Sequence, residues 1–334
     1  MKIAFNHLNN FVPKVSSKPI NNIRFRGGIL SDTFHKNPPI KIDNLSENFD
    51  KPIKIIFSDI AGTMIGGDEY FLNRSLYSSV KDLEQKKIPL VLSTGRSLNE
   101  TYMFSATLPY APDYYILEQG ACILDKDLNL IYKDSISKED SYKILDFYEE
   151  FSKKNPSVQM LASVNDSMYI IDSFSVSPEG KKDPFSFYSL LNRKIEAGQT
   201  PTKFLLFSSR PLEMSKMDKI RTNAMKKIGS DNISILIPDS HSFELINKSS
   251  SKGIAAKFIA DRYGLSLENA VGIGDSENDI SLISMIQDEG GVGVAMGNAQ
   301  QQLVNKAKFI TSSVYNSGFA KMVHSVLKHN EQFD

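Results

Sequence analysis

The 334-residue sequence contains no tryptophan, a single cysteine and no excess of charge of either sign. Because Cys122 is alone, the chain can form neither an internal disulfide nor a metal site built from several thiolates. The apolar neighbours of Cys122 indicate a small buried core residue rather than a nucleophile. The 39 basic and 39 acidic residues cancel, so the charge balance favours neither nucleic acid nor an anionic membrane as a partner.

Long apolar runs are also missing. No stretch approaches the roughly 18 consecutive apolar residues of a transmembrane helix, so we expect no membrane span. The amino terminus lacks the basic-then-apolar layout of a signal peptide, because Asn6, His7 and Asn9 interrupt it. We therefore expect a cytoplasmic protein.

The rest of the composition is that of a globular protein, with 41% hydrophobic and 23% charged residues, and the length suffices for two domains. Residues 1–50 are rich in Asn, Ser, Pro and Lys without periodicity, so we expect a disordered or loosely packed extension. Strand and helix patterns alternate over 51–133. Residues 134–242 mix helices with short strand-like pieces, which predicts an inserted α+β lobe. The first pattern resumes over 243–334, with a return strand at 243–246.

Local patterns predict several individual elements. Leu76, Val80 and Leu83 recur at helical spacing, and Ser97 followed by Glu100 fits a capping box at the start of a helix. We also expect a core strand over 114–123, helices over 141–153 and 185–194, strands over 167–171 and 203–207, and a core helix that ends at Gly264.

Three apolar runs end in residues suited to chemistry. The first leads to Asp59 and is typical of a buried parallel strand, whose carboxyl end is where open α/β sheets place ligands. The second leads to Thr94, in a strand-to-helix turn that suits phosphate oxygens. The third leads to an acidic loop with Asp275 and Asp279. Taken singly, each aspartate has an ordinary interpretation as a turn or helix-capping residue.

Taken together with Lys252, these segments closely resemble the motifs of the haloacid dehalogenase (HAD) superfamily, and in particular its Cof-type sugar-phosphatase branch. The resemblance is strong over about 53–130 and 243–325, and is mainly positional between them. The matching segments are Asp59-Ile60-Ala61-Gly62-Thr63, Thr94-Gly95-Arg96, Lys252-Gly253, Gly274-Asp275 with Asn278-Asp279, Gly297-Asn298-Ala299 and Asn316-Ser317-Gly318.

The resemblance implies an α/β fold: a HAD-like Rossmannoid core with a doubly wound parallel sheet, and an α+β cap at 134–242 that selects the substrate. It implies Mg²⁺-dependent hydrolysis of a small phosphorylated metabolite, with sugar phosphates favoured and no obligate protein partner. Asp59 would attack the phosphoryl group and carry it, and Lys252 would supply positive charge. The implied phosphate-binding residues are Thr94, Gly95, Arg96, Lys252 and Asn278, and the implied Mg²⁺ ligands are Asp59, the backbone carbonyl of Ala61, Asp275 and Asp279.

One residue departs from the family pattern, because Ala61 stands where the family has a second aspartate. In the family this carboxyl group protonates the leaving group and then activates water, and a methyl group can do neither. General acid–base assistance is typically worth about 10²–10⁴-fold, so we expect impaired turnover of an ordinary sugar phosphate. Binding of the metal is expected to survive, since the carbonyl of Ala61 remains.

Several hypotheses follow from Ala61. The chain is a weak phosphatase, or one that uses a good leaving group or a proton donor from elsewhere; it is a natural or engineered knock-down; or it binds phosphorylated ligands without turnover. Phosphonoacetaldehyde hydrolases of the same superfamily also have alanine here, but their cap lies between the first and second motifs. Asp59 and Thr94 are only 35 positions apart, which leaves room for one helix and the next strand, so a phosphonatase is the weaker alternative.

Overall fold

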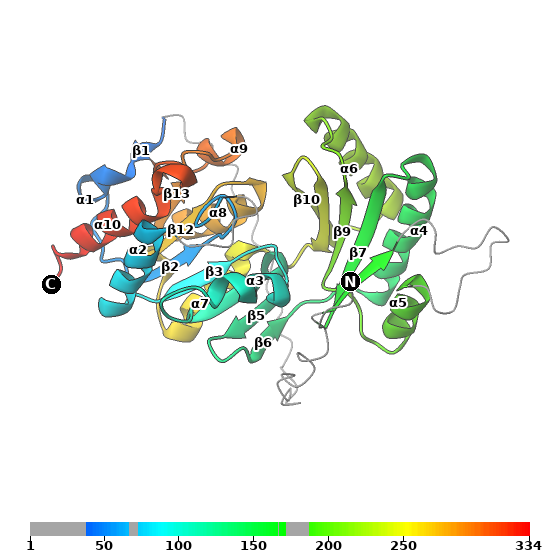
Figure 1. Cartoon of the computed structure of the whole chain (residues 1–334), viewed down its shortest axis with the longest axis horizontal. Coiled ribbons are helices and arrows are strands. Elements are labelled where there is room, and N and C mark those ends of the chain that lie inside the picture. Colours follow the sequence, from blue (N-terminus) through cyan, green and yellow to red (C-terminus); the bar gives the residue numbers. More distant parts are fainter. Residues whose placement is uncertain (1–37, 67–72, 166, 172–186) are drawn as a thin grey trace.

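The computed structural model describes residues 38–66, 73–165, 167–171 and 187–334. These residues form two lobes, each built on its own β-sheet (Figure 1). We call the lobe with the nine-stranded sheet the core and the lobe with the five-stranded sheet the cap. Within the described residues, no helix is long and apolar enough to cross a membrane.

The core sheet is mostly parallel. Its strands lie in the order β1-β14-β13-β12-β2-β3-β4-β5-β6, and only the pairs β4–β5 and β5–β6 are antiparallel. The strands are β1 (Ile40–Lys41), β2 (Ile55–Ser58), β3 (Leu90–Ser93), β4 (Tyr114–Leu117), β5 (Cys122–Asp125), β6 (Leu130–Lys133), β12 (Ala270–Gly274), β13 (Val292–Ala295) and β14 (Phe309–Ile310).

Helices cover both faces of this sheet, which explains why β2 and its neighbours β3 and β12 are buried over their whole length and are mostly apolar. Ile56 packs in a cluster with residues of α2 and α10, whereas Ile55 and Phe57 pack on the other face with residues of α7 and α8. The core helices are α1 (Leu45–Asn48), α2 (Arg74–Gln85), α3 (Leu98–Ser105), α7 (Lys252–Tyr263), α8 (Ile280–Asp288), α9 (Gln301–Val304) and α10 (Gly318–Asn330). The doubly wound α/β architecture predicted from the sequence is confirmed.

Three local signals in the core sequence are also confirmed. Leu76, Val80 and Leu83 form the buried stripe of α2. Ser97 and Glu100 form a capping box in which the Ser97 amide donates to Glu100 Oε2 at 2.9 Å. Helix α7 ends at Gly264, whose φ of +67° lies in the left-handed region that glycine tolerates.

The cap has an antiparallel sheet with the strand order β10-β11-β9-β7-β8. Helices α4 and α6 lie on the side of this sheet that faces away from the core (Figure 1). One apolar cluster joins helices and sheet, so the cap has a hydrophobic core of its own. Its elements are α4 (Lys138–Lys154), β7 (Val158–Val164), β8 (Ser167–Ile171), α5 (Phe187–Glu196), β9 (Lys203–Ser208), α6 (Met214–Ile228), β10 (Ile233–Asp239) and β11 (Ser242–Asn247).

The structure moves the second boundary of the cap. The predicted return to the core at residue 243 is too early, because β11 pairs with β9 and β10 in the cap sheet. Phe243 and Leu245 also pack in the apolar cluster of the cap. The chain therefore re-enters the core after Asn247. An apolar run alone does not tell which of two sheets a strand joins, which is why the sequence placed this boundary too early.

Two further expectations need correction. Residues 38–50 are not loosely packed, because β1 pairs with β14 and Ile42 and Leu45 are buried in the core; residues 1–37 lie outside the described part of the chain. The strand expected over 114–123 is two strands, β4 and β5, which pair antiparallel around the turn Glu118–Gly120. All three residues of that turn have positive φ, which cannot be predicted from an apolar pattern.

Candidate active site

Three neighbouring strands bring the predicted site residues to one edge of the core sheet. Strands β3, β2 and β12 are adjacent and parallel, and Ser58 is in register with Leu92 on one side and with Ile273 on the other. Asp59, Thr94 and Asp275 each follow one of these strands. They therefore lie along the carboxyl edge of the sheet, the usual ligand-binding edge in open α/β folds.

Three carboxylates meet at this edge. Asp59, Asp275 and Asp279 each offer an oxygen within 4.8 Å of the others. Lys252, at the start of α7, donates to Asp59 Oδ1 at 2.7 Å and to Asp279 Oδ1 at 2.6 Å. The ammonium of Lys252 is 0% exposed, so it balances part of the negative charge inside the protein.

Asp279 is held by the backbone of its own loop. Its second oxygen, Oδ2, accepts from the amides of Asp275 and Ser276 at 2.9 and 3.1 Å. Both oxygens of Asp279 are therefore occupied, whereas Asp275 receives one long hydrogen bond, from Asn298 Nδ2 at 3.3 Å. Asp279 organises the loop, and Asp275 is the carboxylate with more unused acceptor capacity.

The three carboxylates of the cluster are close together, and the single positive charge of Lys252 does not neutralise them all. Burial raises the pKa of Asp59 from its ordinary 3.8 to about 6, although Lys252 opposes the shift. Burial together with the charges of Asp59 and Asp279 raises the pKa of Asp275 to about 8. Burial alone would lower the pKa of Lys252, but Asp279 and Asp59 raise it above its ordinary value. A bound cation would relieve this repulsion.

The remaining predicted residues lie in the surrounding loops. The Thr94 side chain is buried and its Oγ1 accepts from the Arg96 amide at 3.2 Å, while Gly95 lies between them. Asn278 Oδ1 accepts from Ser276 Oγ at 2.5 Å, which holds its side chain against its own loop. Ala61 lies in the turn after Asp59 and forms an isolated bridge with Ile65.

Asn298 lies beside the carboxylate cluster, although its sequence position predicts no role for it. Its amide donates to the carbonyl of Gly62 at 2.8 Å as well as to Asp275, and its Oδ1 accepts from the Val314 amide. Asn298 therefore joins the turn after Asp59 to the acidic loop that begins at Asp275. The available signal was the segment Gly297-Asn298-Ala299, which matched the family branch without indicating what the side chain contacts.

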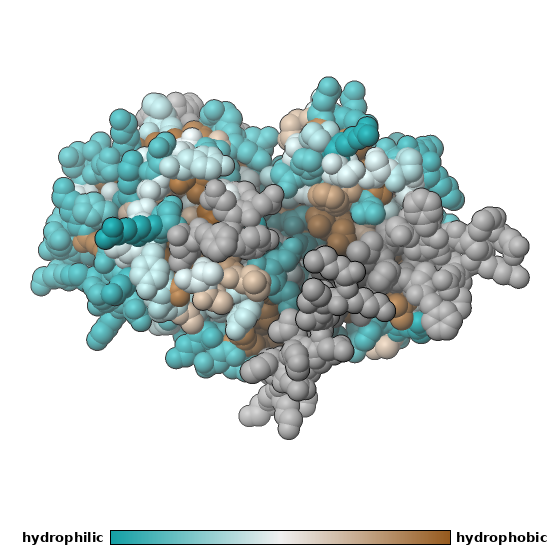
Figure 2. Space-filling view, in the orientation of Figure 1, coloured by the Kyte–Doolittle hydropathy of each residue, from teal (hydrophilic) through white to brown (hydrophobic). Residues whose placement is uncertain are grey.

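The cap touches the core around the carboxylate cluster. Arg221 of α6 forms a 2.8 Å ion pair with Glu277, beside Asp279, and Gln300 Nε2 donates to the cap carbonyl of Pro238 at 3.2 Å. Lys203 of β9 donates to the carbonyl of Gly95. Figure 2 shows a hollow between the two lobes, with apolar residues on its cap side.

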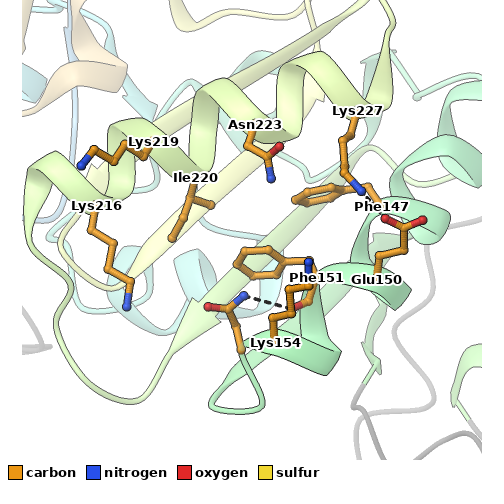
Figure 3. Close-up of a pocket in the computed structure, with 10 residues that line it drawn as sticks. Phe147, Glu150, Phe151, Lys154, Lys216, Lys219, Ile220, Asn223 and Lys227 are labelled. Carbon is orange, nitrogen blue, oxygen red and sulfur yellow. Dashed lines mark hydrogen bonds and ion pairs between the residues drawn. The ribbon is translucent and has the colours of Figure 1, made fainter.

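A cavity of about 260 Å³ lies between α4 and α6, on the outer side of the cap (Figure 3). Phe147 and Phe151 stack in it with their rings 5.4 Å apart, and lysines surround them. None of its lining residues is a predicted site residue, so the carboxylate cluster and this cavity are separate features. The lining residues are Phe147, Glu150, Phe151, Lys154, Asn155, Lys216, Lys219, Ile220, Asn223 and Lys227.

Comparison with known families and proteins agrees with this geometry. The family model for haloacid dehalogenase-like hydrolases matches residues 56–323. Phosphatase YwpJ of Bacillus subtilis is 23% identical over 299 residues, which is 82% of this chain and 100% of that protein. The 5-amino-6-(5-phospho-D-ribitylamino)uracil phosphatase YcsE of Bacillus subtilis is 24% identical over 281 residues, covering 83% of this chain and 98% of that protein.

Solved structures show the same fold. A phosphatase of the haloalkanoate (HAD) enzyme superfamily from Bacteroides thetaiotaomicron superposes with a TM-score of 0.64 at 21% identity, covering 82% of this chain and 95% of that one. The HAD subclass IIB sugar phosphatase BT4131 superposes with a TM-score of 0.62 at 19% identity, covering 81% and 98%. At these identities the likeness establishes the architecture of both lobes.

Proposed function

The chain belongs to the haloacid dehalogenase-like hydrolases, and from that premise we propose that it hydrolyses monoesters of phosphate on small metabolites, with Asp59 as the nucleophile. The family match and the phosphatases among its relatives identify it as a phosphatase. The observation that carries the choice of nucleophile is the double contact of Lys252 with Asp59 and Asp279. This contact leaves the second oxygen of Asp59 for attack, while the positive charge of Lys252 opposes the rise in the pKa of Asp59 that burial causes.

The proposed reaction has two steps. A carboxylate oxygen of Asp59 forms a bond to phosphorus as the bond to the ester oxygen breaks, and the leaving alkoxide takes up a proton. Water then attacks the aspartyl-phosphate, loses a proton and releases inorganic phosphate with the original carboxylate. Thr94, Gly95, Arg96, Lys252 and Asn278 are the residues that we propose to surround the phosphoryl oxygens.

We propose that the carboxylate cluster holds Mg²⁺. The donors are oxygen atoms, which hard cations prefer, and the repulsion that raises the pKa of Asp275 to about 8 is the condition that a cation relieves. Asp59, Asp275, Asp279 and the carbonyl of Ala61 would hold it. When bound, Mg²⁺ would offset the negative charge of the phosphoryl group and help to align it with Asp59.

We expect Ala61 to lower the rate of both steps of the reaction. A methyl group can neither protonate the leaving oxygen nor take a proton from the attacking water. Esters with good leaving groups need less protonation, so we propose that they are cleaved better than simple sugar phosphates.

The cap sheet bears on the substrate class. Sugar phosphates are favoured by the resemblance to the Cof-type branch. One face of the cap sheet points toward the core, because Lys203 and Glu244 on that face contact core residues. Their neighbours on the same face are Leu161, Leu205 and Phe207, which are partly exposed. These side chains suit a leaving group with a flat or apolar portion. The relative YcsE is named for the phosphate ester of a ribitylamino-uracil, whose leaving group contains a flat ring. Such esters are therefore a second candidate class of substrate.

The test is a screen of phosphorylated metabolites with Mg²⁺, run on the natural chain, on Asp59→Asn and on Ala61→Asp. The panel should pair sugar phosphates with phosphates of heteroaromatic compounds and with an aryl phosphate. We expect hydrolysis by the natural chain that Asp59→Asn abolishes. Mg²⁺-dependent binding of phosphate esters without turnover by either the natural chain or Ala61→Asp would instead indicate a phospho-ligand-binding protein.

A further inference from the structure

A buried polar cluster, which the proposed chemistry does not use, joins the core turn Glu118–Gly120 to the cap sheet. The Nζ of Lys203 lies 3.1 Å from Glu244 Oε1, and the amide of Gln119 donates to the other oxygen of Glu244. The hydroxyl groups of Ser163 and Thr202 both donate to Glu118. We call these six residues, all 6% exposed or less, the hinge cluster: Glu118, Gln119, Ser163, Thr202, Lys203 and Glu244.

Lys203 connects this cluster to the proposed phosphate-binding loop. It lies on the cap strand β9, yet its ammonium donates to the carbonyl of Gly95 in the core. Gly95 lies between Thr94 and Arg96, two residues that we propose to contact the phosphoryl group. A cation from the cap therefore holds the backbone of the loop on which those two residues lie.

The same loop is fixed from the core side. The backbone N–H of Gln119 donates to the carbonyl of Thr94 at 3.1 Å. The backbone N–H of Glu118 donates to the carbonyl of Arg96, also at 3.1 Å. Gly95 packs so closely that a β-carbon there would collide with the side-chain amide of Gln119. The loop thus has little room to shift while the hinge cluster is intact.

The turn that supplies these amides has an unfavourable backbone. Glu118 and Gln119 have φ values of +51° and +60°, in the left-handed region. Such conformations are unfavourable for a residue other than glycine, and they persist where the surroundings hold them. The bonds from Ser163 and Thr202 to Glu118, and from Gln119 to Glu244, are side-chain contacts that hold the turn from the cap.

The charge on Lys203 is maintained inside the protein. Burial alone would lower its pKa, but the negative charges of Glu244 and Glu118 raise it above the ordinary value. The side chain is 4% exposed, so it does not present its ammonium to a ligand. Its action on a substrate must therefore pass through the loop that it holds.

We propose that Lys203 is a positioning residue that makes the affinity for phosphate depend on the placement of the cap. With the cap against the core, Lys203 fixes Gly95 and so keeps the Thr94–Arg96 loop in its phosphate-binding form. When the cap moves away, the loop loses this support and binds phosphate more weakly. The inference rests on the proposed function, because it takes this loop to be the one that binds the phosphoryl group.

The experiment measures the affinity of the full-length protein for inorganic phosphate by calorimetry, in the presence of Mg²⁺. Lys203→Met alone would leave Glu244 buried without a cation, so the test variant is Lys203→Met with Glu244→Gln, which removes both charges. The matched control is Lys257→Met with Glu289→Gln, which removes an exposed 2.9 Å pair elsewhere in the core. We expect a loss of affinity of about 10- to 100-fold in the test variant and none in the control, since small misplacements of binding groups have effects of that size.

A purely structural role for the pair would lower the melting temperature and leave phosphate affinity unchanged, and that result would overturn the inference. Kinetics give a second measurement, because a rise in KM for an aryl phosphate that exceeds the fall in kcat is expected only from a change in binding. If the double variant does not fold, Lys203→Arg keeps the ion pair and changes the contact with Gly95. Equal affinity in Lys203→Arg and the natural chain would then refute the proposal, whereas a natural chain that binds no phosphate with Mg²⁺ would refute the proposed function itself.

Discussion

The ammonium of Lys252 lies 2.7 Å from Asp59 Oδ1, although 193 positions separate the two residues in the sequence. The same nitrogen contacts Asp279, and Lys252 and Asp279 have 0% exposed side chains. The three buried charges stabilise the fold only together, because each of them is costly to bury without its partners.

Replacement of Lys252 by Met should therefore destabilise the Mg²⁺-free protein by about 3–5 kcal/mol at neutral pH, the usual cost of leaving a buried charge unpaired. Urea unfolding with a chelator present measures this change. The double variant Lys252→Met with Asp279→Asn removes one of the orphaned charges and should recover part of the loss. Equal stability of Lys252→Met and the natural chain would mean that the carboxylates are protonated or hydrated without Lys252.

Ala61→Asp should raise the turnover of a simple sugar phosphate by about 10²–10⁴-fold, because it restores a group that can protonate the leaving oxygen. An aryl phosphate should gain less. Ala61→Asn has nearly the same shape and transfers no proton, so it should gain nothing. Steady-state kinetics on both esters check the result, and an equal gain from Asp and Asn would show that side-chain size rather than acid–base chemistry matters here.

The metal-free protein should lose stability as the pH rises from about 4 to about 8. The folded-state pKa values of Asp59 and Asp275 are raised from 3.8 to about 6 and about 8, so the folded state binds protons more tightly than the unfolded state does. Each carboxyl group therefore contributes stability when protonated and loses it as the pH passes through its folded pKa.

Mg²⁺ should consequently raise the melting temperature more at pH 8 than at pH 5.5, because it needs both carboxylates ionised. Thermal unfolding with Mg²⁺ or chelator at the two pH values measures the difference. Asp275→Asn should weaken both the pH dependence and the Mg²⁺ effect. A Mg²⁺ effect that is the same at both pH values would argue against a site at this cluster.

Arg221→Gln should favour an open cap. The Arg221–Glu277 pair joins α6 to the acidic loop between Asp275 and Asp279, and its side chains are 30% and 17% exposed. Partly exposed pairs are worth about 0.2–1 kcal/mol, so KM should rise by no more than about fivefold while the melting temperature changes little. Lys257→Gln, which breaks an exposed pair within the core, is the control and should leave KM unchanged. A KM for Arg221→Gln equal to that of the natural chain would show that this pair does not hold the cap.

Leu45→Ala should destabilise the protein by about 2–5 kcal/mol, the range for removing a buried leucine side chain. Leu45 is 1% exposed although it lies in a segment whose composition suggested loose packing. Met103→Ala, at a side chain that is 65% exposed, should cost less than about 0.5 kcal/mol. Equal midpoints for the two variants in urea unfolding would show that residues 38–50 contribute little to the core.

The sequence predicted the core because its signals are local. Asp59, Thr94 and Asp275 each follow a mostly apolar strand, and neighbouring parallel strands place such ends at one edge of the sheet. Leu76, Val80 and Leu83 identified the buried face of α2 in the same way. Composition was a poorer guide: residues 38–50 are polar on average, and the few apolar side chains among them are the ones that pack.

The contacts between lobes could not be predicted. Lys203 and Glu244 stand among apolar strand residues, and nothing in the alternation tells that their side chains meet each other and the backbone of Gly95. The double contact of Lys252 likewise depends on how α7 packs against the ends of β2 and β12. Such pairings are set by tertiary structure, since the partners are far apart in the sequence.

The insertion of the cap also orders the events of folding. Both of its connections are tied to Asp134, which accepts from Asn247 Nδ2 at 3.0 Å and from Ser250 Oγ at 2.8 Å. The central neighbours β2 and β12 are separated in the sequence by the whole cap, so the middle of the core sheet cannot close until β12, at residues 270–274, has been synthesised. During translation the cap has its full set of strands before β2 acquires its partner β12. The first half of the core must therefore wait with one edge of the apolar strand β2 unpaired, and an unpaired strand edge exposes the chain to aggregation during this interval.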